Sequence, residues 1–279
     1  MKRIKWIISD FKINSMKKAI VLVFFFLLVH ATFSQTIVEK DFSKYFNKYG
    51  VNGCFALYNP NTDEYFNYNS ARCDSGFIPA STFKIPNSLI ALEEGVIEDT
   101  NQIIKWDGHE WPNKNWNQNH TLKTAIKYSC VWAYEGFAEQ IGIEKYMKYM
   151  NEFNYGNKDL TGPPTRFWLE GPFRISANQQ VDFLKKLYYN ELGISKQSTD
   201  IVKSIIIRKT GSNYVLSGKS GSGLISDNNI VYWFVGYIEK DNVPYFYALN
   251  ISGTEADRTK YYIRNNILKG IFKELEIME

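Results

Sequence analysis

The sequence predicts an α+β fold, with one antiparallel sheet flanked by helices and divided by an inserted all-helical subdomain. Two short segments early in the chain alternate apolar and polar residues, and a long middle region repeats its apolar residues with helical spacing. Strand-like patterns then return near residue 205. Strands, helices, strands and a final helix in this order are typical of an α+β protein.

The expected strands are separated by residues that favour turns. Residues 59–63 read Asn-Pro-Asn-Thr-Asp, which predicts a hairpin between the two early strands. A helix at 38–49 is expected before this hairpin, and a closing helix at 256–276. The expected strands are 53–58, 64–68, 205–208, 213–217, 230–239 and 244–252.

The inserted region is predicted to be helical with two long loops. Gly95 and Gly142 are expected to end helices, because glycine commonly follows the last helical residue. Segment 100–119 is rich in Trp and Asn, and segment 155–176 is rich in Gly and Pro, so both are expected to be irregular. The expected helices are one that follows Ser81 to about Glu94, then 121–127, 131–141, 143–153, 178–190 and 196–204.

The first 34 residues have the pattern of a secretory signal peptide. Two lysines precede an apolar run at 19–29, and small or polar residues follow, as in such peptides. The run is too short for a comfortable membrane span. We expect cleavage after Ser34, with Ala31 as the alternative, and hence a secreted, periplasmic protein with no membrane anchor.

The remaining residues, 35–279, are expected to form one domain. Removing residues 1–34, whose net charge is +5, changes the formal net charge from +4 to about −1. Net charge therefore gives no support for binding to nucleic acid or to an anionic membrane. Met1 and Met16 remain alternative starts, because a chain beginning at Met16 would also carry a complete signal peptide.

Ser81 and Lys84 are the leading candidates for chemistry. They stand three residues apart at the start of an apolar helix, where positions i and i+3 share a face. Apolar neighbours of Lys84 would exclude water, lower the pKa of its amine and allow the neutral amine to act as a base. The alternative is a capped helix with an exposed lysine.

Three further positions have both a catalytic and a structural interpretation. Ser129, between two expected helices, could pass a proton to a leaving nitrogen, or could cap the helix that begins near Val131. Trp168 could direct its indole N–H into the site or could simply be core. Of two Lys-Ser/Thr-Gly segments, the one at Lys209 has the sequence of a turn, so we choose Lys219, on a strand expected at the sheet edge beside the nucleophile.

Cysteines and histidines suggest no metal centre. Cys54 and Cys73 could form a disulfide in an exported protein, or remain buried free thiols. Cys130 is left over, and we assign it no chemistry, although its place beside Ser129 could make the site sensitive to thiol reagents. His109 and His120 lie in the Trp/Asn-rich loop without ligand spacing, so we predict no metal site.

Five motifs occur in the order and approximate spacing of one known family. Between about residues 53 and 273, the sequence resembles the class D serine β-lactamases, which are penicillin-recognising serine enzymes. The motifs are Pro-Ala-Ser-Thr-Phe-Lys at 79–84, Ser-x-Val at 129–131, Tyr-Gly-Asn at 155–157, Phe-Trp-Leu-Glu-Gly at 167–171 and Lys-Ser-Gly at 219–221.

This resemblance implies a mechanism for opening a β-lactam ring. Ser81 would be the nucleophile, and Lys84 would bind CO2 to become N6-carboxylysine, the general base, with no other cofactor. Trp168 would donate a hydrogen bond to the carbamate. Ser129 and Lys219 would relay a proton to the departing nitrogen.

The resemblance also implies a set of substrate contacts. Val131 would form part of the apolar wall, and the backbone N–H groups of Ser81 and Ser222 would form the oxyanion hole. The substrate carboxylate would be held by Lys219, by Ser220 of the Lys-Ser-Gly motif that ends at Gly221, and by Arg258. Arg264 is the weaker candidate for that arginine.

Several alternatives stay open at this point. A penicillin-sensing domain or a DD-peptidase would share the fold and be acylated without efficient turnover, and an exported binding module would do no chemistry. The preferred β-lactams depend on the shape of the loops around Trp111, Pro172 and 223–227. Monomer and homodimer are both compatible with the sequence.

Overall fold

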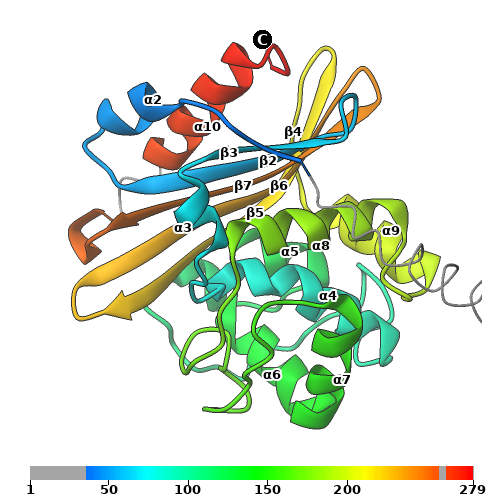
Figure 1. Ribbon diagram of the computed structural model, residues 1–279. Helices are drawn as coiled ribbons and strands as arrows, with labels where there is room; N and C mark the ends of the chain where they lie inside the picture. Colours follow the sequence, from blue (N-terminus) through cyan, green and yellow to red (C-terminus); the bar gives the residue numbers. More distant parts are fainter. Residues whose placement is uncertain (1–35, 258–261, 279) are drawn as a thin grey trace, which may run out of the picture. The chain divides into compact units, whose positions relative to one another are not determined.

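The computed structural model describes residues 36–257 and 262–278, and a seven-stranded sheet organises this part of the chain (Figure 1). The strand order is β1-β3-β2-β7-β6-β5-β4. The strands are β1 (Ile37–Glu39), β2 (Gly53–Asn59), β3 (Glu64–Tyr68), β4 (Ile207–Thr210), β5 (Tyr214–Ser226), β6 (Asn229–Lys240) and β7 (Val243–Gly253). The predicted fold class is confirmed, although the sheet is mixed because β1 pairs with β3 in parallel.

Helices cover both faces of the sheet. In Figure 1, α2 and α10 lie on one face and the inserted helices lie on the other. The α-helices are α2 (Ser43–Asn47), α3 (Ser70–Asp74), α4 (Lys84–Glu93), α5 (Leu122–Lys127), α6 (Val131–Ile141), α7 (Ile143–Phe153), α8 (Ala177–Tyr189), α9 (Lys196–Ile205) and α10 (Tyr262–Glu274). The described ranges also contain three short 3-10 helices, namely η1 (Ala80–Phe83), η2 (Lys114–Trp116) and η3 (Glu255–Asp257).

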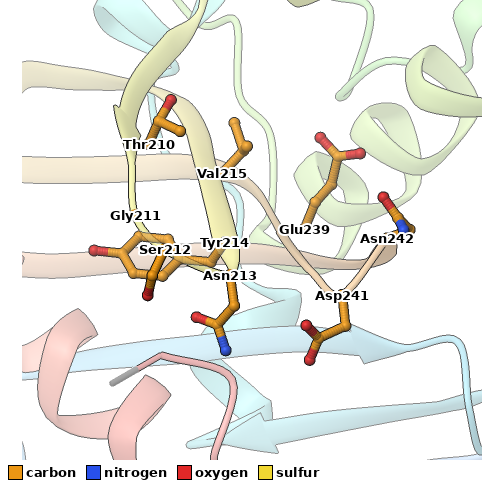
Figure 2. Close-up of a pocket in the computed structure, with 9 residues that line it drawn as sticks. All are labelled: Thr210, Gly211, Ser212, Asn213, Tyr214, Val215, Glu239, Asp241 and Asn242. Carbon is orange, nitrogen blue, oxygen red and sulfur yellow. The ribbon is translucent and has the colours of Figure 1, made fainter.

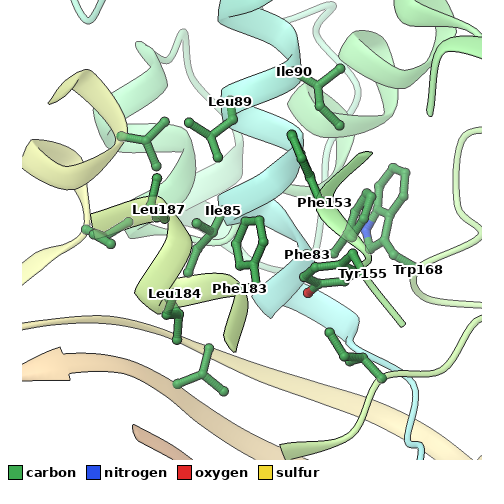
Figure 3. Packing of buried hydrophobic residues seen from close by; sticks show 14 of the residues in the cluster. Phe83, Ile85, Leu89, Ile90, Phe153, Tyr155, Trp168, Phe183, Leu184 and Leu187 are labelled. Atoms are coloured by element: carbon green, nitrogen blue, oxygen red, sulfur yellow. The ribbon is translucent and has the colours of Figure 1, made fainter. Parts of the chain in front are cut away.

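The sheet separates two hydrophobic cores, and strand β2 shows how. Successive side chains of a strand point to opposite faces. Phe55 and Leu57 belong to the core beneath α2 and α10, whereas Cys54, Ala56 and Tyr58 belong to the larger core beneath the inserted helices. The inserted helices are therefore held on the sheet by continuous apolar packing, part of which Figure 3 shows.

The expected helix at 38–49 is wrong in its first half. Residues 37–39 instead form β1, which pairs with β3 in the register Ile37↔Tyr65. The helix begins only at Ser43, whose N–H is accepted by the Asp41 carboxylate at 2.9 Å. The apolar spacing of this segment is compatible with either structure, and the free edge of β3 decides between them.

Strand β5 is much longer than the expected 213–217. It runs to Ser226 and pairs with β6 along its length, so Lys219 lies within the strand. Glycines at 218, 221 and 223 hide the strand pattern in the sequence. The edge strand at this side of the sheet is β4, so the expectation that β5 is an edge strand is wrong. Because β4 pairs with β5 only as far as Ser217, however, the segment from Lys219 onward has one open edge in the described part of the chain.

The interior of the insertion agrees more closely with the prediction. Helices α6 and α7 have the expected bounds, separated by Gly142 at φ +79°. Helix α3 was not expected; Asn69 caps it by accepting the Arg72 N–H at 3.3 Å.

All three cysteines are buried free thiols, so the disulfide between Cys54 and Cys73 does not form in this structure.

Two predictions concern residues near the ends of the chain. The signal peptide at 1–34 lies outside the described residues, so it remains a prediction. Residues 258–261 of the expected helix 256–276 also lie outside them, so that part of the helix remains a prediction as well. Within the described ranges, no helix has both the length and the apolar composition needed to cross a membrane.

A pair of glycines facing each other across β5 and β6 should be intolerant of side chains. Gly218 is opposite Gly236, and a Cβ on Gly236 would lie 2.6 Å from the Gly218 Cα and even closer to the Ser217 carbonyl oxygen. We expect Gly236→Ala to lower the free energy of unfolding by roughly 1–3 kcal/mol, measured by urea denaturation.

Gly136→Ala is the matched control for that measurement. Gly136 lies in helix α6, and apart from its chain neighbours and the backbone of its own helix, no described atom would lie within 4 Å of a Cβ there. Its replacement should raise the stability by about 0.5–1 kcal/mol. Equal effects of the two substitutions would contradict the packing argument.

Candidate active site

Ser81 lies in the η1 turn, which leads directly into helix α4. The residue before it, Ala80, has φ +49°, a conformation that is uncommon for residues other than glycine. The Ala80 N–H donates to the Trp168 carbonyl oxygen at 2.9 Å. Backbone strain beside a half-buried serine is typical of a nucleophile held in a defined orientation.

Lys84 is the first residue of α4 and is completely buried. Its Nζ has no hydrogen-bond partner among the described residues and lies 4.7 Å from the centre of the Tyr134 ring. Burial lowers the pKa of its amine to about 8. The alternative of an exposed lysine is therefore wrong, and an appreciable fraction of the amine is neutral near neutral pH.

Trp168 packs against Phe83, the residue that precedes Lys84. Its ring is fully buried and stacks on Phe83 with the centroids 5.5 Å apart. Figure 3 labels both side chains. The indole Nε1 also has no partner in the described part of the chain. A buried polar group without a partner costs about 1–3 kcal/mol. Lys84 Nζ and Trp168 Nε1 are two such donors, linked through Phe83, which suggests that an added acceptor serves both.

Ser129 and Lys219 are in direct contact. The Lys219 Nζ donates to the Ser129 Oγ at 2.5 Å and to the Ser220 carbonyl oxygen at 2.7 Å. Ser129 does not cap α6, because the N-cap is Cys130 and makes no side-chain hydrogen bond. Burial, followed by the nearby positive charge of Lys84, holds the pKa of Lys219 well below its usual range.

Strand β5 packs closely against the η1 turn at Gly221, which has no side chain. A Cβ on Gly221 would lie 3.0 Å from the Pro79 carbonyl oxygen and 3.1 Å from the Thr82 nitrogen, so only glycine fits without displacement. The half-buried Ser220 and Ser222 flank this contact. The predicted oxyanion donors, on Ser81 and Ser222, thus belong to two segments that pack together.

The remaining predicted contacts have mixed outcomes. Val131 is the half-buried first residue of α6, two residues after Ser129. Arg258 lies outside the described residues, so its role is still a prediction. Arg264 is buried, and its Nη1 donates to the Gly221 carbonyl oxygen at 3.0 Å and to the Trp233 carbonyl oxygen at 2.9 Å. Arg264 therefore supports the strand that carries the Lys-Ser-Gly motif.

The rejected motif at Lys209 lies in the hairpin between β4 and β5. Thr210 and Gly211 line an open cavity of about 300 Å³ that also includes Glu239 and Asp241 (Figure 2). None of the predicted site residues lines this cavity. Its size alone therefore does not identify it as the catalytic site.

Histidines and acidic residues offer no metal centre in the described ranges, where no group of three or more potential ligands is found. His120 is buried, and its Nδ1 lies 3.0 Å from the Thr124 hydroxyl, so it has a packing role.

The sequence analysis missed Tyr134, whose ring lies beside the Lys84 amine, and the ion pair between Arg166 and Glu135. The only available signal was proximity to the Ser-x-Val and Phe-Trp motifs.

Comparison with known proteins identifies the class. Residues 53–273 match the family model for the penicillin binding protein transpeptidase domain. The chain is 39% identical over 240 residues to beta-lactamase OXA-48 of Klebsiella pneumoniae, covering 86% of this chain and 89% of that protein. The protein therefore belongs to the penicillin-binding transpeptidase-domain family.

Solved structures refine this assignment. The class D beta-lactamase of Sebaldella termitidis is 34% identical with a TM-score of 0.84, covering 88% of this chain and all of that one. The C-terminal domain of the Bacillus licheniformis BlaR penicillin receptor is 33% identical with a TM-score of 0.83, covering 88% of this chain and 99% of that one. Within its family, the chain is a class D serine β-lactamase.

The buried thiols provide a test of the core around the site. Burial raises the pKa of the Cys130 thiol to about 11, and all three cysteines are fully buried. We expect no reaction with a thiol reagent in the native protein and three reactive thiols after denaturation. Rapid native labelling, or a single thiol after denaturation, would contradict the free, buried state of these residues.

Proposed function

We propose that this protein hydrolyses the β-lactam ring of penicillin-type antibiotics through an acyl-enzyme on Ser81, with carboxylated Lys84 as general base, and so confers antibiotic resistance. The observation that carries the proposal is the fully buried, unpartnered amine of Lys84, one helical turn after Ser81. A neutral amine can react with CO2, whereas a protonated amine cannot. The lowered pKa of Lys84 makes the reactive form available.

The residues around Lys84 are suited to hold a carbamate. Trp168 Nε1 is a buried donor without an acceptor among the described residues, and a carbamate oxygen would provide one. The carbamate would supply the general base for acylation and again for deacylation. The adjacent rings of Tyr134, Phe83 and Trp168 would exclude bulk water from it.

Ser129 and Lys219 would return the proton to the substrate. The Ser129 oxygen accepts a hydrogen bond from Lys219 Nζ, which leaves its own O–H free to donate. As the ring opens, Ser129 would give this proton to the departing nitrogen, and Lys219 would replace it. The transfer from Lys219 to Ser129 would follow the hydrogen bond that joins them.

The other polar groups would fix the substrate. The N–H groups of Ser81 and Ser222 would stabilise the oxyanion, and Lys219, Ser220 and Arg258 would bind the substrate carboxylate. Val131 would contact its apolar part. We further propose that the protein is exported to the periplasm, with removal of residues 1–34, and acts there as a monomer or homodimer.

A penicillin-sensing role is the second candidate, favoured by the similarity to the BlaR penicillin receptor. A sensor would be acylated at Ser81 and would remain acylated. The geometry of nucleophile and base is compatible with both roles, because they differ in the rate of deacylation. Turnover therefore distinguishes them.

The decisive experiment is penicillin hydrolysis by the purified mature protein, with and without bicarbonate. We expect turnover that bicarbonate increases, and a loss of about a thousandfold or more in Ser81→Ala and Lys84→Ala, because each removes a group that takes part in bond making. Ser204→Ala and Lys123→Ala, on exposed helix surfaces, are the matched controls. Stoichiometric acylation without turnover would favour the sensor.

The pKa of Lys84 predicts how reactivation depends on pH. Its amine is protonated below about pH 8, so CO2-depleted protein should regain activity more slowly as the pH falls. At a fixed concentration of dissolved CO2, the initial rate should drop roughly tenfold per pH unit well below 8 and level off above it. A rate that does not change between pH 6 and 9 would mean that Lys84 is not the reacting group.

A further inference from the structure

We propose that Arg166 is a positioning residue, which holds Trp168 against the carboxylated Lys84 by joining the 155–176 loop to helix α6. This inference rests on the proposed carboxylation of Lys84 and adds a residue outside the five motifs. Among the described residues, Arg166 makes no hydrogen bond or ion pair with Ser81, Ser129 or Lys219. It would act through Trp168 and helix α6.

Arg166 makes two ion pairs, one with Glu135 of helix α6 and one with Glu170 of its own loop. Its Nη1 lies 2.6 Å from Glu135 Oε1, and its Nε lies 2.9 Å from Glu170 Oε1. The Glu135 side chain is only 20% exposed, whereas that of Glu170 is 51% exposed. The Arg166–Glu135 pair is therefore the better shielded of the two and should be the stronger.

Arg166 also organises the turn that presents Trp168. Its carbonyl oxygen accepts the N–H groups of Leu169 at 2.8 Å and Glu170 at 2.9 Å, and its own N–H donates to Pro163. Trp168 lies inside this turn, and its carbonyl oxygen accepts the Ala80 N–H of the η1 turn. A displacement of Arg166 would therefore move Trp168 and disturb the backbone next to Ser81.

Glu135, the partner of Arg166 in this ion pair, stands next to Tyr134 in the sequence, and the Tyr134 ring lies beside the Lys84 amine. Glu135 follows Tyr134 on α6, and the Tyr134 ring lies 4.7 Å from Lys84 Nζ. Tyr134 is itself fixed by a 2.8 Å hydrogen bond with the buried Ser88 hydroxyl of α4. The Arg166–Glu135 pair thus connects the loop that carries Trp168 to helix α6, which carries Tyr134.

A positioning role and a purely electrostatic role of Arg166 and Glu135 predict different effects of single substitutions on the carboxylation of Lys84. Glu135 raises the pKa of Lys84 and Arg166 lowers it, so both charges act on that amine. If charge alone mattered, Arg166→Gln would weaken carboxylation, because a cation favours an anionic carbamate, and Glu135→Gln would strengthen it. If the ion pair positions Trp168, both substitutions weaken carboxylation.

The experiment measures the bicarbonate concentration that gives half-maximal activity. We compare the mature protein with Arg166→Gln, Glu135→Gln, their combination, and the exchange Arg166→Glu with Glu135→Arg. Both single variants should need about tenfold more bicarbonate, and the double variant should be no worse than either single variant. The exchanged pair should recover most of the difference. Carbamate occupancy is followed independently by NMR with ¹³C-labelled bicarbonate.

Two controls separate positioning from general loss of stability. Lys196→Gln removes an exposed ion pair on α9, and Glu170→Gln removes the exposed partner of Arg166. Both should leave the bicarbonate requirement within about twofold of the parent. At saturating bicarbonate, Arg166→Gln should regain most of its activity, which a damaged fold would not.

The outcomes are distinct. Opposite shifts in the two single variants, unchanged requirements, or failure of the exchanged pair to recover would each overturn the positioning role while leaving the proposed function intact. A parent protein with no bicarbonate dependence would instead remove the carboxylated base and this inference together. If the single variants do not fold, the exchanged pair alone decides.

Discussion

A lysine amine that is closed off from water and left without a partner is the constraint on which the rest of the site depends. Burial disfavours the charged form of Lys84, and the described residues offer no carboxylate in contact with its Nζ to offset that cost. A fold retains such a group when it has a use. The neighbouring unpartnered indole of Trp168 makes an added acceptor the simplest explanation for both.

The pocket is built from segments that are distant in the sequence. Lys84 comes from α4, Tyr134 from α6 and Trp168 from the 155–176 loop, and these meet only because the inserted helices pack as a unit on the sheet. The proposed proton relay crosses the same boundary, because Ser129 precedes α6 and Lys219 lies on β5. Substitutions that loosen the insertion should therefore affect base and relay together.

The sequence predicted local features well and long-range pairings less well. The bounds of α6 and α7 follow from apolar spacing and Gly142, and those of β3 from alternation and the preceding turn. The strand β1 and the length of β5 depend on partners elsewhere in the sheet, which no local pattern contains. Likewise, whether Ser129 capped a helix or met Lys219 could be decided only by the position of β5. Arg166 was missed because its partner Glu135 is 31 residues away.

The two buried lysines are electrostatically dependent on each other. The positive charge of Lys84 contributes to lowering the pKa of Lys219, since two cations in one water-poor site repel each other. Carboxylation, as proposed, would replace the cation at Lys84 by an anion and so reverse the sign of this interaction. Lys219 would then be held protonated, which is the state it needs to donate to Ser129 and to attract a substrate carboxylate. In this scheme the same reaction with CO2 would create the base and prepare the proton relay.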